Sequence, residues 1–145
     1  MKRLTSSTIL FLMCVSIAIL SCGQDTPLAA YEPKSPPEQG LKKTLLEFQD
    51  AVKAKNADKV KNLLSENASI MVGRERKILS KKEYVEILSE RLAENPPISF
   101  GKPKMTVNGD NAEVRIYVTR GDSNFLVVYD LQFENDKWYI QSWRY

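Results

Sequence analysis

Asp130 is the acidic residue of this sequence whose neighbours could support proton transfer. It lies in the apolar run 125–133, FLVVYDLQF, directly after Tyr129. A carboxylate buried in an apolar pocket acquires a raised pKa, and a tyrosine beside it can stabilise a developing oxyanion. The 145 residues contain no histidine, so the commonest base at neutral pH and a common zinc ligand are both missing. An enzyme built on this chain would therefore be a histidine-free one.

The alternation of the same run argues against a catalytic Asp130. Side chains of a strand point to opposite faces in turn. Five large residues at alternate positions share one face of the predicted strand: Phe125, Val127, Tyr129, Leu131 and Phe133. Asp130 falls on the other face with Gln132 and Glu134. We therefore expect a solvated or interface role for Asp130, and no catalytic residue is predicted.

Aromatic residues on apolar faces are better candidates for a binding site. The predicted pocket consists of Phe48, Tyr84, Tyr129, Phe133 and Trp138. Such rings would line an apolar cavity, and their hydroxyl and indole groups would orient a small apolar ligand. The alternative interpretation is plain core packing. No metal site and no cofactor are predicted.

A second apolar surface is predicted on the opposite face of the same strands. Its members are Leu126, Val128, Tyr139 and Trp143. An exposed apolar patch usually marks a partner, so we expect self-association into a homodimer through this face. Coverage of these residues by loops of the same chain is the alternative.

Three helices are expected to position the pocket. Leu41, Leu45, Phe48 and Val52 follow a 3.6-residue period and predict a helix, which ends where Asn56-Ala57-Asp58 interrupts the pattern. A short second helix over 60–64 and a brief strand over 68–72 follow. Ser80 and Glu83 form a capping box that opens a third helix, and Pro96-Pro97 ends it.

The rest of the chain alternates like strands. Asn108-Gly109 is a strong hairpin signal between strands at 105–107 and 114–118. Turns at 121–124 and 134–137 then separate the strand 125–133 from a last one that begins at Trp138. Helices followed by a meander predict an α+β domain with helices packed on one face of an antiparallel sheet.

Two local patterns have a structural and a functional interpretation. Arg120-Gly121-Asp122 contains a tripeptide that integrins recognise, but Gly and Asp are also what a hairpin turn requires, and we favour the turn. Five basic residues cluster between the predicted strand and the third helix: Arg74, Arg76, Lys77, Lys81 and Lys82. They indicate a solvated loop and helix start; contact with anionic lipid headgroups or cell-wall polymers is the alternative.

The N-terminus has the composition of a secretory signal. Lys2 and Arg3 precede the apolar run 8–20, and the small Ser21 precedes Cys22. As a helix, the thirteen residues of that run would span about 20 Å, less than the ~30 Å hydrocarbon core of a bilayer. A removed signal is therefore favoured over a retained span.

Ile19-Leu20-Ser21-Cys22 resembles the lipobox of bacterial lipoproteins. The resemblance implies that residues 1–21 are removed, that Cys22 carries lipid and anchors the chain in the membrane, and that Gly23 directs it to the outer membrane. The other cysteine, Cys14, lies in the removed run, so no disulfide is expected.

The predicted mature chain has a tether and one domain. Residues 22–40 hold the lipidated cysteine and a Pro-rich stretch, read as an extended tether, and residues 41–145 form the domain. Lys2 and Arg3 are two of 21 basic residues, so the remaining 19 nearly balance the 18 acidic ones. That balance does not support nucleic-acid binding.

Residues 41–145 also resemble the nuclear transport factor 2-like superfamily, whose members are also called SnoaL-like or cystatin-like. The likeness rests on Phe48 to Val52, on Lys55-Asn56-Ala57-Asp58 and on Asp136-Lys137-Trp138-Tyr139-Ile140. It implies a cone-shaped domain in which three N-terminal helices pack on a curved antiparallel sheet. We therefore expect an envelope lipoprotein that acts as a small-ligand-binding or protein-interaction module. The alternative is a histidine-free isomerase or dehydratase with a buried carboxylate and a tyrosine.

Overall fold

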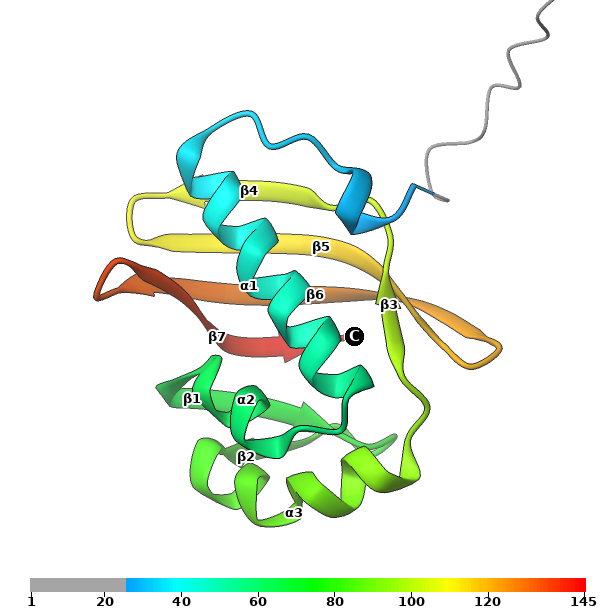
Figure 1. The fold of residues 1–145 in the computed structure, drawn as a ribbon. Helices are drawn as coiled ribbons and strands as arrows, with labels where there is room; N and C mark the ends of the chain where they lie inside the picture. The colour runs from blue at the N-terminus through cyan, green and yellow to red at the C-terminus, as the bar shows by residue number, and fades with distance from the viewer. Residues whose placement is uncertain (1–25) are drawn as a thin grey trace, which may run out of the picture.

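A computed structural model of the protein describes residues 26–145 (Figure 1). The predicted signal peptide, the lipobox and Cys22 lie outside the described residues. Among residues 26–145, no helix is long and apolar enough to cross a membrane.

Helix α1 (Pro36–Lys53) begins five residues before the predicted apolar stripe. The Ser35 side chain accepts a hydrogen bond from the Glu38 backbone N–H, and Pro36 and Pro37 occupy the first positions of the helix. A proline there loses no hydrogen bond, because the first helical N–H groups have no partner within the helix. The two prolines, which were interpreted as part of a tether, therefore start the helix.

The segment before α1 packs on the domain. It includes a short 3-10 helix, η1 (Leu28–Ala30), whose Leu28 is only 1% exposed. Lys42 of α1 donates hydrogen bonds to the backbone oxygens of Ala29 and Tyr31 at 2.8 and 2.7 Å. The predicted domain start at residue 41 is therefore too late, and an extended tether is wrong for residues 28–40.

The other two α-helices each begin after a capping residue. Asn56 caps α2 (Ala57–Asn62) by accepting from the Lys59 backbone N–H at 3.0 Å. The predicted capping box of Ser80 and Glu83 opens α3 (Lys81–Glu94), which ends just before Pro96. Leu63 and Leu64, predicted to extend the second helix, instead lead into the sheet.

Within the described residues, seven strands form one sheet: β1 (Leu64–Val72), β2 (Lys77–Ser80), β3 (Ile98–Phe100), β4 (Lys104–Asn108), β5 (Asn111–Arg120), β6 (Ser123–Glu134) and β7 (Lys137–Arg144). Their order is β2-β1-β7-β6-β5-β3, and β4 pairs with β5 beyond the end of β3. Every pair is antiparallel except β1 with β7, which is parallel. The hairpin at Gly109 and the turn at Gly121 form as predicted, and both glycines have positive φ.

Helix α1 lies across one face of the strands (Figure 1), and its apolar stripe meets the inward side chains of the sheet. Leu41, Leu45 and Phe48 are each at most 4% exposed. The α+β class, with helices on one face of a curved sheet, is confirmed. Residues 26–145 contain this core entirely, so we expect them to fold as an independent domain.

A β-bulge in β7 changes the predicted face of Trp143. Leu131 pairs with Ile140 but Asp130 pairs with Ser142, so Gln141 is an extra residue that reverses the alternation beyond it. Trp143 therefore lies opposite Tyr129, on the inner face. The prediction that Trp143 belongs to an outer interface is wrong for this reason.

Candidate functional site

A cavity of about 710 Å³ lies between the helices and the inner face of the sheet. Its walls come from the last turns of α1, from α3, from the β1–β2 turn, from the β5–β6 hairpin and from the end of β7. Small-molecule sites typically occupy about 300–1,000 Å³, so the cavity has the size of a binding site for one small ligand.

Trp143 is the centre of an aromatic wall in this cavity. Its ring centroid lies 5.4 Å from that of Tyr84, 5.7 Å from that of Phe48 and 6.0 Å from that of Tyr129. The indole N–H donates to the Met71 backbone oxygen at 2.9 Å, which fixes the ring orientation. Sequence reasoning missed Trp143 because alternation cannot reveal the bulge at Gln141.

Three of the five predicted pocket residues meet in the cavity, and two do not. Phe48, Tyr84 and Tyr129 line it. Phe133 and Trp138 lie elsewhere on the inner face and pack against each other, with ring centroids 5.3 Å apart. They belong to the structural core.

Trp138 fills the space between the sheet and the start of α1. A Cβ atom added to Gly40 would lie only 2.7 Å from Cδ1 of Trp138. The Thr44 hydroxyl donates to the Trp138 backbone oxygen at 3.0 Å. We call this region, made of Gly40, Thr44, Phe133 and Trp138, the closed end of the inner face.

The two cavity tyrosines are neutral hydrogen-bond donors at physiological pH. Burial raises the pKa of Tyr84 to about 12, although the positive charges of Arg91 and Arg120 act in the opposite direction. Burial also raises the pKa of Tyr129, the effect of Tyr84 adds to it, and Arg120 opposes it. Within residues 26–145, neither hydroxyl has a hydrogen-bond partner, so both remain free to bind a ligand.

Among the described side chains of the cavity wall, the charged ones are all arginines. Arg74, Arg91 and Arg120 line the cavity, and the described residues contribute no aspartate or glutamate to its wall. Arg120 continues the inward series Val114, Ile116 and Val118 of β5. The period-two alternation of β5 therefore indicates an inward Arg120. Sequence reasoning instead assigned Arg120 to the turn that contains the integrin tripeptide.

The Arg120 guanidinium is placed by an aromatic ring rather than by a carboxylate. Its Cζ lies 5.7 Å from the centroid of Phe125. Its Nε is buried and has no hydrogen-bond partner among the described residues. Arg91 lies seven residues after Tyr84 on α3, a spacing that puts both on one helix face.

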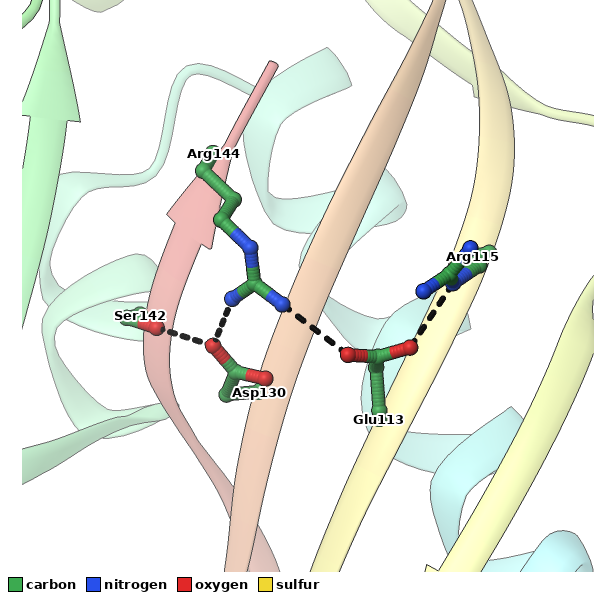
Figure 2. A network of polar contacts seen from close by, with 5 residues as sticks. All are labelled: Glu113, Arg115, Asp130, Ser142 and Arg144. Atoms are coloured by element: carbon green, nitrogen blue, oxygen red, sulfur yellow. Dashed lines mark hydrogen bonds and ion pairs between the residues drawn. The ribbon is translucent and has the colours of Figure 1, made fainter.

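Asp130 belongs to a polar network on the outer face of the sheet, opposite the cavity (Figure 2). It accepts hydrogen bonds from the Ser142 hydroxyl at 2.7 Å and from Arg144. Arg144 also contacts Glu113 at 2.9 Å, and Arg115 donates to Glu113 at 2.7 Å. The hydrogen bond from Arg115 is the main reason that the pKa of Glu113 is lowered. Asp130 thus lies on the face that alternation predicts.

The remaining predicted interface residues also lie on the outer face. Leu126 is 44% exposed, and Val128 and Tyr139 are half-buried. Leu126 is also among the residues that line the cavity. Among residues 26–145, no group of three or more His, Cys, Asp or Glu side chains lies close enough to hold a metal ion.

No family model and no curated protein matches this sequence. Solved structures do resemble the domain. A nuclear transport factor 2-like protein from Cytophaga hutchinsonii superimposes with a TM-score of 0.66 at 8% identity, covering 75% of this chain and 96% of its own. A protein of unknown function with a cystatin-like fold from Nostoc punctiforme gives 0.65 at 14% identity, covering 78% and 92%.

A candidate ketosteroid isomerase from Shewanella frigidimarina gives a TM-score of 0.62 at 21% identity, covering 72% of this chain and 94% of its own. Identities this low establish the fold and not the activity. The chain therefore has a nuclear transport factor 2-like fold, with helices packed against a curved, unclosed sheet.

Proposed function

We propose that this protein is a binding module that holds one small, largely apolar molecule in the cavity beside Trp143. The observation that carries the proposal is the cavity of about 710 Å³ with its wall of Phe48, Tyr84, Tyr129 and Trp143. Aromatic walls with a few polar groups are typical of small-molecule sites, where the rings bind the apolar body and the polar groups orient it.

Binding fits the geometry better than the alternative, an isomerase or dehydratase with a buried carboxylate. Such an enzyme needs an acidic group within hydrogen-bond reach of the substrate. Asp130 is on the opposite face and pairs with Arg144, and the described cavity wall holds arginine instead of an acid. The tyrosine of that mechanism is present, but a carboxylate beside it is not among these residues.

The test is calorimetric titration of residues 26–145 with two probes of equal length, decanoate and decanamide. We expect at least one to bind with 1:1 stoichiometry. Val52 lines the cavity, so Val52→Trp should fill it and abolish binding. Lys53→Trp adds the same side chain at an exposed neighbouring position and should bind like the parent. Failure of both probes with the parent, or unchanged binding by Val52→Trp, would overturn the proposal.

We further propose that lipid on Cys22 anchors the domain at the outer membrane. Support comes from the basic start, the short apolar run and Ile19-Leu20-Ser21-Cys22. Cells that express the full chain and are fed labelled palmitate should label the parent and a Cys14→Ser control, but not Cys22→Ser. Label in Cys22→Ser would contradict the anchor, and density-gradient separation of the two membranes tests its location.

We also propose self-association through the outer sheet face. Leu126 is 44% exposed there and stands beside Val128. Strands with apolar outer side chains favour a partner that covers them. In sedimentation velocity, the parent should sediment as a dimer and Val128→Glu as a monomer, because a buried unpaired charge disfavours the interface. A monomeric parent, or a Val128→Glu dimer as stable as that of the parent, would count against it.

A further inference from the structure

The described side chains of the cavity wall carry positive charge without a compensating Asp or Glu. Arg74, Arg91 and Arg120 line it, and none of the three forms an ion pair with an acidic residue of the described chain. Arg74 is exposed, whereas Arg91 and Arg120 are half-buried. The two half-buried arginines have therefore lost part of their hydration without gaining a carboxylate in exchange.

The arginines on the outer face of the sheet, in contrast, pair with acidic side chains. Arg115 is five residues before Arg120, points to the opposite face and pairs with Glu113 at 2.7 Å. Arg144 pairs with Glu113 and Asp130 (Figure 2). The arginines of the outer face have acidic partners although they lie nearer to solvent, and the cavity arginines have none.

Arg120 is held so that its donors remain available. Its guanidinium lies over the Phe125 ring, with Cζ 5.7 Å from the centroid, and this cation–π contact uses none of its N–H donors. Its Nε is buried and unpartnered within residues 26–145. A buried donor without a partner costs free energy, and a bound ion or ligand that accepts from it removes that cost.

We propose that the ligand of this cavity is an anionic amphiphile: an apolar body with one carboxylate or phosphate group, which Arg120 and Arg91 bind. This inference rests on the proposed function, because it specifies the molecule held in the same cavity. The planar donors of arginine match both oxyanions with paired hydrogen bonds. The anionic group replaces the hydration lost by the two arginines.

The other wall groups fit the two parts of such a molecule. Phe48 and Trp143 present apolar surface to the body. Tyr84 and Tyr129 offer neutral O–H donors, which can bind a carboxylate or phosphate oxygen beside the arginines. An uncharged amphiphile such as decanamide gains the apolar contacts but offers the arginine donors only a neutral acceptor, so it should bind more weakly.

The test compares decanoate with decanamide, which share the same chain and differ in the head group: a charged carboxylate against a neutral amide of similar size. In calorimetric titration of residues 26–145, we expect decanoate to bind at least about tenfold more tightly, the effect of a charge-assisted hydrogen bond. Arg120→Gln should remove most of that preference, because it lowers the affinity for decanoate much more than the affinity for decanamide. Arg115→Gln, on the same strand but the outer face, is the matched control and should keep the preference.

Three results would overturn the inference. Equal binding of decanoate and decanamide would reject the anionic group while the proposed function stands, whereas no binding of either probe would reject the proposed function itself. A preference for decanoate retained in Arg120→Gln would show that other residues recognise the negative charge.

If thermal unfolding shows that Arg120→Gln is unfolded, Arg91→Gln on α3 gives the same comparison. Decyl phosphate, titrated alongside, distinguishes a phosphate from a carboxylate ligand.

Discussion

The two tryptophans of β7 lie on the same inner face and have opposite surroundings. Trp138 is 4% exposed and fills the closed end so completely that Gly40 has no room for a Cβ atom. Trp143 is half-buried and lines the cavity among Phe48, Tyr84 and Tyr129. One sheet face thus provides a packed core at one end and a binding space at the other. The difference implies that stability and ligand binding can be changed separately.

The largest expected effect is at the closed end. Trp138→Ala removes a buried ring and leaves a void, so the free energy of unfolding should fall by about 3–5 kcal/mol. Trp143→Ala should cost less, about 1–2 kcal/mol, because its ring already borders open space. Urea denaturation of the two variants measures the difference. Equal losses would show that the two ends are packed alike.

Of the two ends of the inner face, only the cavity end, which holds Tyr84 and Tyr129, should make stability depend on alkaline pH, because the closed end contains no ionisable side chain. Burial raises the pKa of Tyr84 from 10.0 to about 12. The folded chain therefore holds this proton more tightly than the unfolded chain. The resulting stability is complete below pH 10 and is lost as the pH rises through 12. It amounts to up to about 2–3 kcal/mol.

Tyr84→Phe removes the ionisable hydroxyl, so this part of the alkaline loss should disappear. Urea unfolding of the variant and the parent between pH 9 and 12 measures it. If both lose stability in parallel over that range, the tyrosine hydroxyl is not responsible.

Gly40→Ala tests how tightly the closed end is filled. In an ordinary helix this change stabilises by about 0.5–1 kcal/mol. Here the new methyl group would lie 2.7 Å from Trp138 Cδ1. We expect a net loss of about 1–2 kcal/mol in chemical denaturation, because overpacking outweighs the gain in helix propensity. In a Trp138→Leu background the penalty should vanish, and a penalty that persists there would place its cause elsewhere.

A substitution on the outer face of the sheet serves as the reference for changes in stability and ligand preference at the two ends of the inner face. Asp130→Asn weakens an ion pair with a partly exposed Arg144, so the free energy of unfolding should change by about 1 kcal/mol or less. The ligand preference of the cavity should not change, because Asp130 points away from it. A change in stability as large as that of Trp138→Ala would mean that the network supports the core.

Local signals predicted most of the elements. The capping box of Ser80 and Glu83 and the stripe from Leu41 to Val52 predicted two helices, because caps and periodicity depend on neighbours in the chain. The short strands β2 and β3 were missed, because each is defined by its partner rather than by its own few residues. The segment 28–35 was misread because its single buried anchor, Leu28, gives no periodic pattern.

The sequence by itself determined the α+β class, the caps and hairpins, and the inward aromatics Phe48, Tyr84 and Tyr129. All of these depend on spacing along the chain. Only the tertiary structure decided which aromatics share the cavity, because the bulge at Gln141 turned Trp143 inward and Gly40 allowed Trp138 to pack on α1. It also decided that Arg120 meets a ring instead of a carboxylate. These contacts join segments far apart in the chain, and no local pattern specifies which segments meet.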